Sequence, residues 1–138
     1  MSEENEEQVV ISRKLQDADL LKFADLANKY DYSIGITILS KGVLITGRTI
    51  SGKQYYNSIA DASGSAPIAE YFRKVSAPLY TLQDGENVAT VNFPLNFIHL
   101  ENVSMKSGDG LFSQLNGALL RIKIEEIDGY ILGESKAS

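Results

Sequence analysis

The chain has 138 residues, of which 43% are hydrophobic and 22% charged, and its formal net charge is −5. It contains no cysteine, which excludes disulfide bonds and thiolate metal sites and favours a reducing compartment. This length suits one globular domain that buries roughly two-thirds of its unfolded surface. No apolar run approaches the ~20 residues that span a bilayer, so we expect a cytoplasmic protein with no membrane partner.

The negative charge is concentrated at the N-terminus. Residues 1–7 carry four of the 18 acidic residues and no base, which leaves 14 acids against 13 bases, or −1, for the remainder. A terminal block of like charge is typical of a solvated tail. We therefore expect residues 1–16 to be an acidic, disordered tail and lead-in, residues 17–134 a single globular domain, and residues 135–138 a C-terminal tail.

The first regular element in the sequence is an amphipathic helix. Leu20, Phe23, Ala24 and Ala27 recur at helical spacing, and the pattern ends near Tyr30. Either of two preceding aspartates, Asp17 and Asp19, can cap the helix N-terminus. The apolar stripe predicts a helix that covers one face or open end of a sheet.

A β-hairpin follows directly. Two β-branched apolar runs, Ile34–Leu39 and Val43–Ser51, flank the turn-forming cluster Ser40–Gly42. Gly47 lies inside the second run, where a glycine weakens a strand unless the strand bends, bulges or adopts a positive φ. The sequence therefore predicts a strongly bent hairpin.

A helical insert separates this hairpin from the remaining strands. Residues from Gly52 lead through a helix-to-turn passage, and a second short helix begins after Ser65 and is expected to close at Ser76–Pro78. Leu79–Asn92 has no clear periodicity and fits either a loop or a loosely paired hairpin.

Three further strands are predicted near the C-terminus. They are Phe97–Met105, Ala118–Ile124 and Ile127–Leu132, the last two separated by a bend at Glu125–Glu126. In the middle strand of the three, apolar and charged residues alternate, which indicates one buried and one solvated face. The order of helix, two strands, helical insert and three strands predicts a mainly β, α+β fold.

Three motifs suggest chemistry, but none predicts an enzyme. Gly47–Gln54 approaches the phosphate-binding pattern, yet Gln54 replaces the hydroxyl that would hold Mg²⁺ and the strand continues where a glycine-rich cradle should open. His99 is the single histidine and is expected to be a packed structural residue. Glu125 and Glu126 are adjacent, so in a strand they point to opposite faces. We therefore assign no catalytic, cofactor-binding or metal-binding residue, and we expect no cofactor.

Several segments resemble the gas vesicle accessory protein U family. The resemblance spans Leu20–Gly133 with the helical insert between Ile59 and Asn96 unmatched. It rests on the segments Ala27–Lys29, Ile34–Leu39, Ile45–Gly47, Ile50–Tyr55, Phe97–Asn102 and Arg121–Gly133. It implies a non-enzymatic, gas vesicle associated protein that acts in vesicle assembly, shell association or clustering, with gas vesicle shell or accessory proteins as partners.

The order of strands also resembles an Sm-like barrel, in which an N-terminal helix caps a strongly bent five-stranded sheet. The edge strands of such barrels pair between subunits, so we expect a homo-oligomer that forms through the last two strands, within Leu119–Leu132. RNA binding is the alternative that this resemblance implies. We do not expect it, because the available cations are interleaved with acids: Lys41, Arg48, Lys53, Lys106, Arg121 and Lys123.

Overall fold

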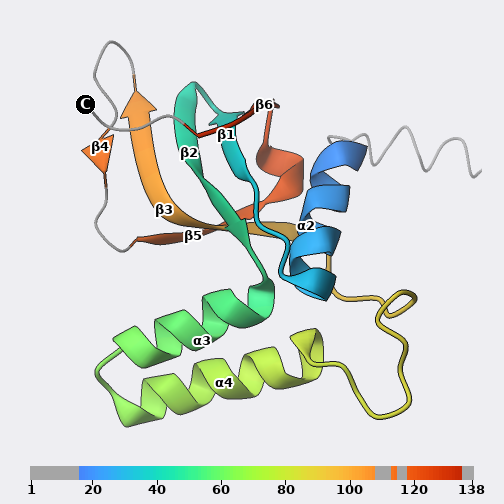
Figure 1. Ribbon diagram of the computed structural model, residues 1–138. Coiled ribbons are helices and arrows are strands. Elements are labelled where there is room, and N and C mark those ends of the chain that lie inside the picture. The colour runs from blue at the N-terminus through green and yellow to red at the C-terminus, as the bar shows by residue number, and fades with distance from the viewer. Residues whose placement is uncertain (1–15, 108–112, 115–117, 135–138) are drawn as a thin grey trace, which may run out of the picture.

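The computed structural model describes residues 16–107, 113–114 and 118–134. Residues 1–15 of the expected acidic tail, and the C-terminal tail, lie outside the described residues. The described part contains three α-helices and one antiparallel sheet, with helix α2 on one face of the sheet and the pair α3 and α4 at its lower end (Figure 1). The α+β class predicted from the sequence is confirmed.

Helix α2 spans Ala18–Tyr30, as predicted. The Asp17 side chain caps it by accepting hydrogen bonds from the backbone N–H groups of Asp19 and Leu20, at 2.8 and 3.1 Å. The helix ends at Asp31, which has a left-handed conformation with φ of 54°. Its buried residues, Leu20, Ala24 and Ala27, belong to the stripe that the spacing predicted.

The sheet has six strands but is five strands wide, because two short strands share one edge position. Its strands are β1 (Gly35–Ser40), β2 (Val43–Ile50), β3 (Phe97–Ser107), β4 (Ser113–Gln114), β5 (Leu119–Lys123) and β6 (Gly129–Leu132). β4 and β5 pair with opposite ends of β3, so the order across the sheet is β4 and β5, then β3, β2, β1 and β6. The last two strands of the chain, β5 and β6, therefore lie on opposite edges of the sheet. The sequence predicted both of them as edge strands.

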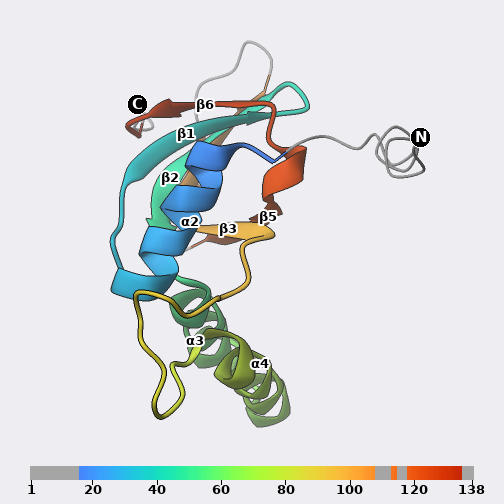
Figure 2. The ribbon, with the colours of Figure 1, turned by 90° about the vertical axis from the view of Figure 1, so that its right-hand side faces the viewer.

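The sheet is strongly bent but does not close. Figure 2 shows β1 curving around one side of α2, with β6 above the helix and β3 and β5 on its other side. Among the described residues, β5 and β6 form no ladder with each other, so the expected Sm-like barrel is an open sheet. The barrel prediction was wrong on this point because the 3-10 turn Ile124–Glu126 joins β5 to β6 across the open side, and β6 pairs with β1 alone.

A β-bulge lies opposite Gly47, one of the three features that the glycine predicted there. Thr46 pairs with Ser104 and Arg48 with Glu101, so two residues of β3 face one residue of β2. The bulge lies on β3, where Asn102 has a left-handed conformation with φ of 55°. Gly47 itself has no positive φ; a Cβ atom there would lie 2.8 Å from the backbone oxygen of Glu101. The glycine is therefore required by close approach of the two strands.

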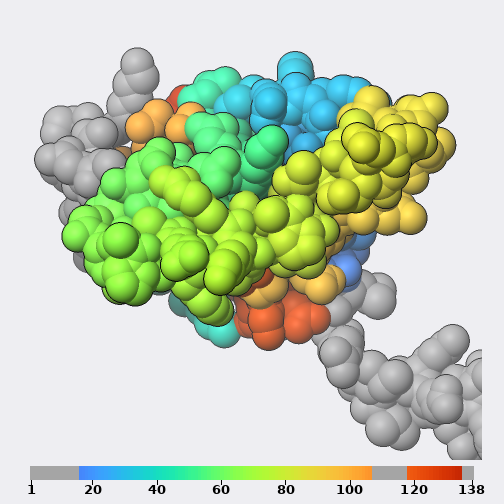
Figure 3. All heavy atoms as spheres, turned by 90° about the horizontal axis from the view of Figure 1, so that it is seen from below, coloured from blue at the N-terminus to red at the C-terminus, as the bar shows by residue number. Residues whose placement is uncertain are grey.

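Helices α3 (Gly52–Ala62) and α4 (Ala66–Tyr80) form an antiparallel pair that covers the lower end of the molecule (Figure 3). Helix α4 was expected to close at Ser76–Pro78, but Pro78 lies inside it. A proline in the last turn removes one hydrogen bond near the helix end, where the exposed backbone can still reach water. The following residues, 81–96, form neither helix nor strand, which favours the loop interpretation of that segment over the hairpin.

Two apolar cores hold these layers together. The main core lies between α2 and the sheet, and is built on Leu20, Ile36, Ile38, Ile98 and Leu100. The second core lies between the helical pair and the sheet, and contains the buried rings of Tyr56, Tyr80 and Phe93. The second core joins segments that lie far apart in the sequence.

Candidate functional site

His99 is buried within the fold. It lies on β3, is 2% exposed, and its ring centroid is 4.7 Å from that of Tyr55. Burial, assisted by the nearby Arg121 charge, lowers the pKa of His99 from 6.5 to about 3, so the ring is neutral near pH 7. Its Nε2 atom has no hydrogen-bond partner among the described residues. Three tyrosine rings, those of Tyr55, Tyr56 and Tyr80, lie against the histidine ring.

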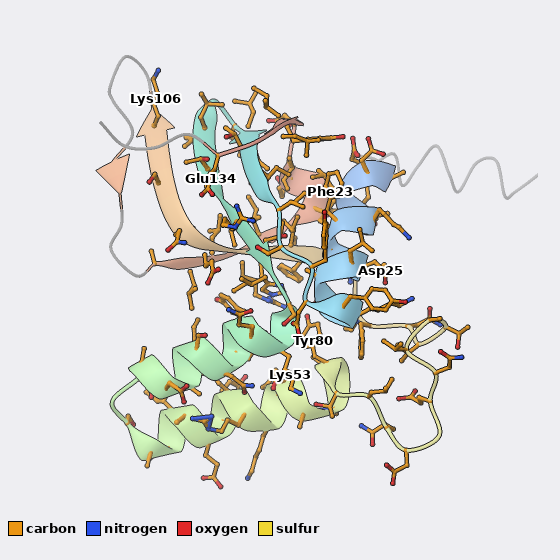
Figure 4. All side chains as sticks on the ribbon, viewed as in Figure 1. Phe23, Asp25, Lys53, Tyr80, Lys106 and Glu134 are labelled. Atoms are coloured by element: carbon orange, nitrogen blue, oxygen red, sulfur yellow. The ribbon has the colours of Figure 1, made fainter. Side chains whose placement is uncertain are left out.

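Arg121 on β5 lies next to His99 and is held by aromatic rings. Its guanidinium carbon is 3.5 Å from the ring centroid of Phe97 and 5.7 Å from that of Tyr56. These cation–π contacts join the sheet to helix α3. Figure 4 shows Tyr80 where the end of α4 meets the start of α3 and the sheet. The cluster therefore fastens the helical pair to the sheet.

The phosphate-like motif at Gly47–Gln54 forms no phosphate cradle. β2 runs to Ile50 and helix α3 begins at Gly52, so no loop separates strand from helix. Two amides of the first turn are already engaged: the Gly52 N–H donates to Asn28 Oδ1 at 2.8 Å, and the Gln54 N–H donates to Ser51 Oγ at 2.9 Å. The start of α3 therefore differs from a phosphate loop, whose backbone N–H groups are free to bind the anion.

The adjacent carboxylates Glu125 and Glu126 lie in a 3-10 turn and not in a strand. Glu126 forms an ion pair with Lys41 at 2.8 Å, whereas Glu125 lines a cavity of about 250 Å³ with Lys123 and Asn96. The two side chains therefore have separate environments. In the described ranges, no group of three or more His, Asp or Glu side chains could hold a metal ion.

The cations of the described residues form no basic patch. Arg48 pairs with Glu134 at 3.1 Å, Lys41 pairs with Glu126, and Arg121 is stacked between aromatic rings. Figure 4 shows Lys53 and Lys106 at opposite ends of the molecule. Phosphate backbones are normally bound by clustered positive charge, which this distribution does not provide.

Six of the nine exposed large hydrophobic side chains of the described residues lie on two surfaces. The first, the α4 face, consists of Ile68, Tyr71 and Leu79 on helix α4 with Leu82 just beyond it, and Tyr71 is 62% exposed. The second, the β6 edge, consists of Ile131 and Leu132, which are 66% and 61% exposed. Across the described residues no helix is long and apolar enough to cross a membrane. Such surfaces on a small domain are typical of protein–protein contacts.

A third feature lies at the opposite edge of the sheet. There, helix α3 and strand β5 border an apolar groove of about 300 Å³, which we call the α3–β5 groove. It is lined by Ile59, Ala62 and Ser63 of α3 and by Leu119 of β5. Of the described strands, β3 alone pairs with β5.

The sequence did not reveal the aromatic cluster or these surfaces. Tyr55 and Tyr56 stood beside each other in a predicted helix, but their partners Tyr80, Phe93 and Arg121 are far away in the chain. The exposed positions Ile131 and Leu132 looked like ordinary strand residues, because periodicity alone does not show which strand lies at an edge. The alternation of Arg121 and Lys123 with Leu120 and Ile122 was the available signal for the two faces of β5.

Comparison with known proteins identifies the family. A family model described as "Gas vesicle protein GvpU-like" matches residues 17–135. The matched range includes the helical pair, which the resemblance of the separate segments left unmatched. No match was found among curated proteins or among solved structures. The chain therefore belongs to the GvpU-like family of gas vesicle proteins.

Proposed function

We propose that this protein is a non-enzymatic accessory protein of gas vesicles that acts in the cytoplasm through protein–protein contacts. The observation that carries the proposal is the family match over residues 17–135. The role is vesicle assembly, association with the shell or clustering of vesicles, and the partners are shell or accessory proteins. The enclosed His99 and the capped start of α3 give no support to a catalytic role.

The two apolar surfaces support a role in joining proteins together. The α4 face and the β6 edge belong to different layers of the fold, at the lower end and the upper part of the molecule (Figure 1). A domain with two separate apolar surfaces can contact two partners at once, which assembly and clustering both require. The open edges of the sheet further support a homo-oligomer, since unpaired edge strands readily pair with another chain.

RNA binding through an Sm-like ring is the second candidate, and the open five-stranded sheet with its capping helix is the observation that favours it. The paired or stacked state of Lys41, Arg48 and Arg121 weighs against it. An RNA-binding ring would hold uridine-rich or adenine-rich oligonucleotides with an affinity that falls steeply as salt concentration rises. We expect no such binding by fluorescence anisotropy.

Electron microscopy of vesicle-producing cells, with and without this protein, tests the proposed role. A change in vesicle number or shape indicates assembly, and a change from dispersed to grouped vesicles indicates clustering. Unchanged vesicles in both respects, together with sub-micromolar, salt-sensitive RNA binding, would transfer the assignment to the RNA-binding alternative.

A further inference from the structure

Helix α4 carries an apolar stripe that the described part of the chain leaves uncovered. Its exposed members, each at least 41% exposed, are Ile68, Tyr71, Leu79 and, just beyond the helix, Leu82. The helix packs on the fold through its other side, where Tyr80 is buried. Tyr71 lies nine residues before Tyr80, so the two rings point to opposite sides of a helix with 3.6 residues per turn. Figure 3 shows α4 on the outside of the molecule seen from below.

The stripe is symmetric along the chain. At its centre lies Val75, which is partly buried against the second core. Tyr71 and Leu79 each lie four residues from Val75, and Ile68 and Leu82 each lie seven residues from it. An antiparallel copy of the helix, related by a two-fold axis beside Val75, therefore places Tyr71 of each copy against Leu79 of the other. The same axis places Ile68 of each copy against Leu82 of the other.

Charge also favours contact between copies on this face. The helical pair, residues 52–80, contains three bases and two acids, a net charge of +1, so the remaining residues carry −6 and give the total of −5. Four of these five charged groups form ion pairs within the chain, Arg73 with Asp61 and Lys74 with Glu70. Two chains of net charge −5 repel each other, and the repulsion is weakest where the facing surfaces are nearly neutral.

We propose that α4 of one copy packs antiparallel on α4 of a second copy, about a two-fold axis beside Val75. The inference rests on the proposed function, because it specifies a contact through which a copy on one vesicle joins a copy on another. Both copies use the same surface, so this contact closes at two copies. It uses one helix of each copy and no sheet edge. Its area is therefore at the low end of the range, below roughly 1,200 Å² in total, which is typical of weak, reversible contacts.

Engineered cysteines test the contact, because the chain has none of its own. Full-length Tyr71→Cys and Leu79→Cys are mixed, at a concentration on the order of 100 µM for a weak contact, and oxidised. A denaturing gel then measures the fraction of chains joined in pairs. The two changed positions face each other in the antiparallel contact, so the mixture is expected to cross-link.

Each cysteine variant alone should cross-link several-fold less than the mixture. In two like chains the changed positions are offset by eight residues, about 12 Å along the axis, whereas a disulfide requires Cα atoms within ~7 Å. Tyr32→Cys is the matched control for Tyr71→Cys, because Tyr32 is similarly exposed but lies in the loop after α2, and it should not cross-link to Leu79→Cys. Equal cross-linking by the mixture and by Tyr71→Cys alone would overturn the antiparallel contact.

A charge exchange tests the same contact by light scattering. The parent is expected to have a mass at least twice the 15.1 kDa of one chain. Tyr71→Glu and Leu79→Lys each place a charge against an apolar side chain of the other copy, so each should have a lower mass than the parent. In an equal mixture the new carboxylate faces the new ammonium group, and the second pair of facing side chains is unchanged. The mixture should therefore regain the mass of the parent.

Tyr32→Glu is the control for the charge exchange, since it makes the same change at an exposed position outside α4, and it should assemble like the parent. Circular dichroism checks that each variant is folded. A monomeric parent, a Tyr71→Glu variant that assembles like the parent, or a mixture that stays as small as its components would overturn the proposal.

Flotation with purified gas vesicles separates failure of this contact from failure of the proposed function. A parent that rises with the vesicles but neither assembles nor cross-links through α4 contradicts the α4 contact and leaves the gas vesicle role intact. A parent that pairs through α4 but never rises with vesicles supports the α4 contact and contradicts the role.

Discussion

Acidification should destabilise this protein through His99 in particular. The buried ring has a pKa of about 3 in the folded state, against 6.5 for an exposed histidine. As the pH falls below 6.5, the unfolded chain binds a proton that the folded chain does not, so the free energy of unfolding decreases. The stabilisation is complete above pH 6.5 and is lost progressively down to about pH 3.

The size of the effect follows from the same two pKa values. Over the whole range the loss is about 5 kcal/mol, from 3.5 pKa units at about 1.4 kcal/mol each. Between pH 7.5 and 5.5 the expected loss is about 1.4 kcal/mol, because the unfolded histidine is then mostly protonated. The upper part of the range is preferable for measurement, since the sequence pI is near 4.8 and proteins precipitate readily near zero net charge.

Urea unfolding followed by circular dichroism measures this difference in the parent and in His99→Leu, which fills the same apolar site without a titrating group. Carboxylates contribute equally to both proteins, so the difference between their pH dependences isolates His99. His99→Gln provides a second comparison if the leucine variant folds poorly. Equal pH dependence in the parent and both variants would show that His99 is not buried as a neutral ring, and would refute the reasoning.

Three other predictions concern single residues. Gly47→Val should lower the free energy of unfolding by ~1–3 kcal/mol although valine favours strands, because its Cβ atom would lie 2.8 Å from the Glu101 backbone oxygen. A melting temperature equal to or above that of the parent would mean that the two strands do not approach so closely. Asp17→Ala should cost about 1 kcal/mol in urea unfolding, while Asp17→Asn, which keeps the capping oxygen, should cost much less. The Tyr130 hydroxyl donates to Asp19 Oδ2 at 2.7 Å, and this bond raises the pKa of Tyr130 to about 12. Asp19→Asn should therefore shift the pKa of that tyrosine toward 10 in an ultraviolet titration. An unchanged titration would contradict the contact.

Local features of the fold could be predicted from the sequence because each depends on neighbouring residues. The Asp17 cap, the buried stripe of α2 and the hairpin turn at Ser40–Gly42 are all of this kind. Gly47 predicted a bend, a bulge or a positive φ, because a glycine in a strand has few other uses. That the extra residue lies on β3, at Asn102, could not be predicted, since it depends on the register between two strands distant in the sequence.

Contacts between distant segments could not be predicted from the sequence pattern. The stacking of Arg121 on Phe97 requires the β3 and β5 register, which pairs Phe97 with Lys123 and His99 with Arg121. Whether the sheet closes depends on the path of the turn after Lys123, where two glutamates suggested a bend but not its direction. The candidate surfaces depend on those long-range results, because Ile131 and Tyr71 are exposed only as a consequence of which strands and helices pack together.

Flotation with purified gas vesicles is the most direct test of the proposed role. Gas vesicles rise in a centrifuge, whereas a free protein of this size stays in solution, so the fraction of the chain in the floating layer measures binding. We expect the parent to rise with the vesicles at both low and high salt concentration, because the exposed surfaces are apolar. A chain that remains in solution at every salt concentration, while the vesicles float without it, would contradict the account.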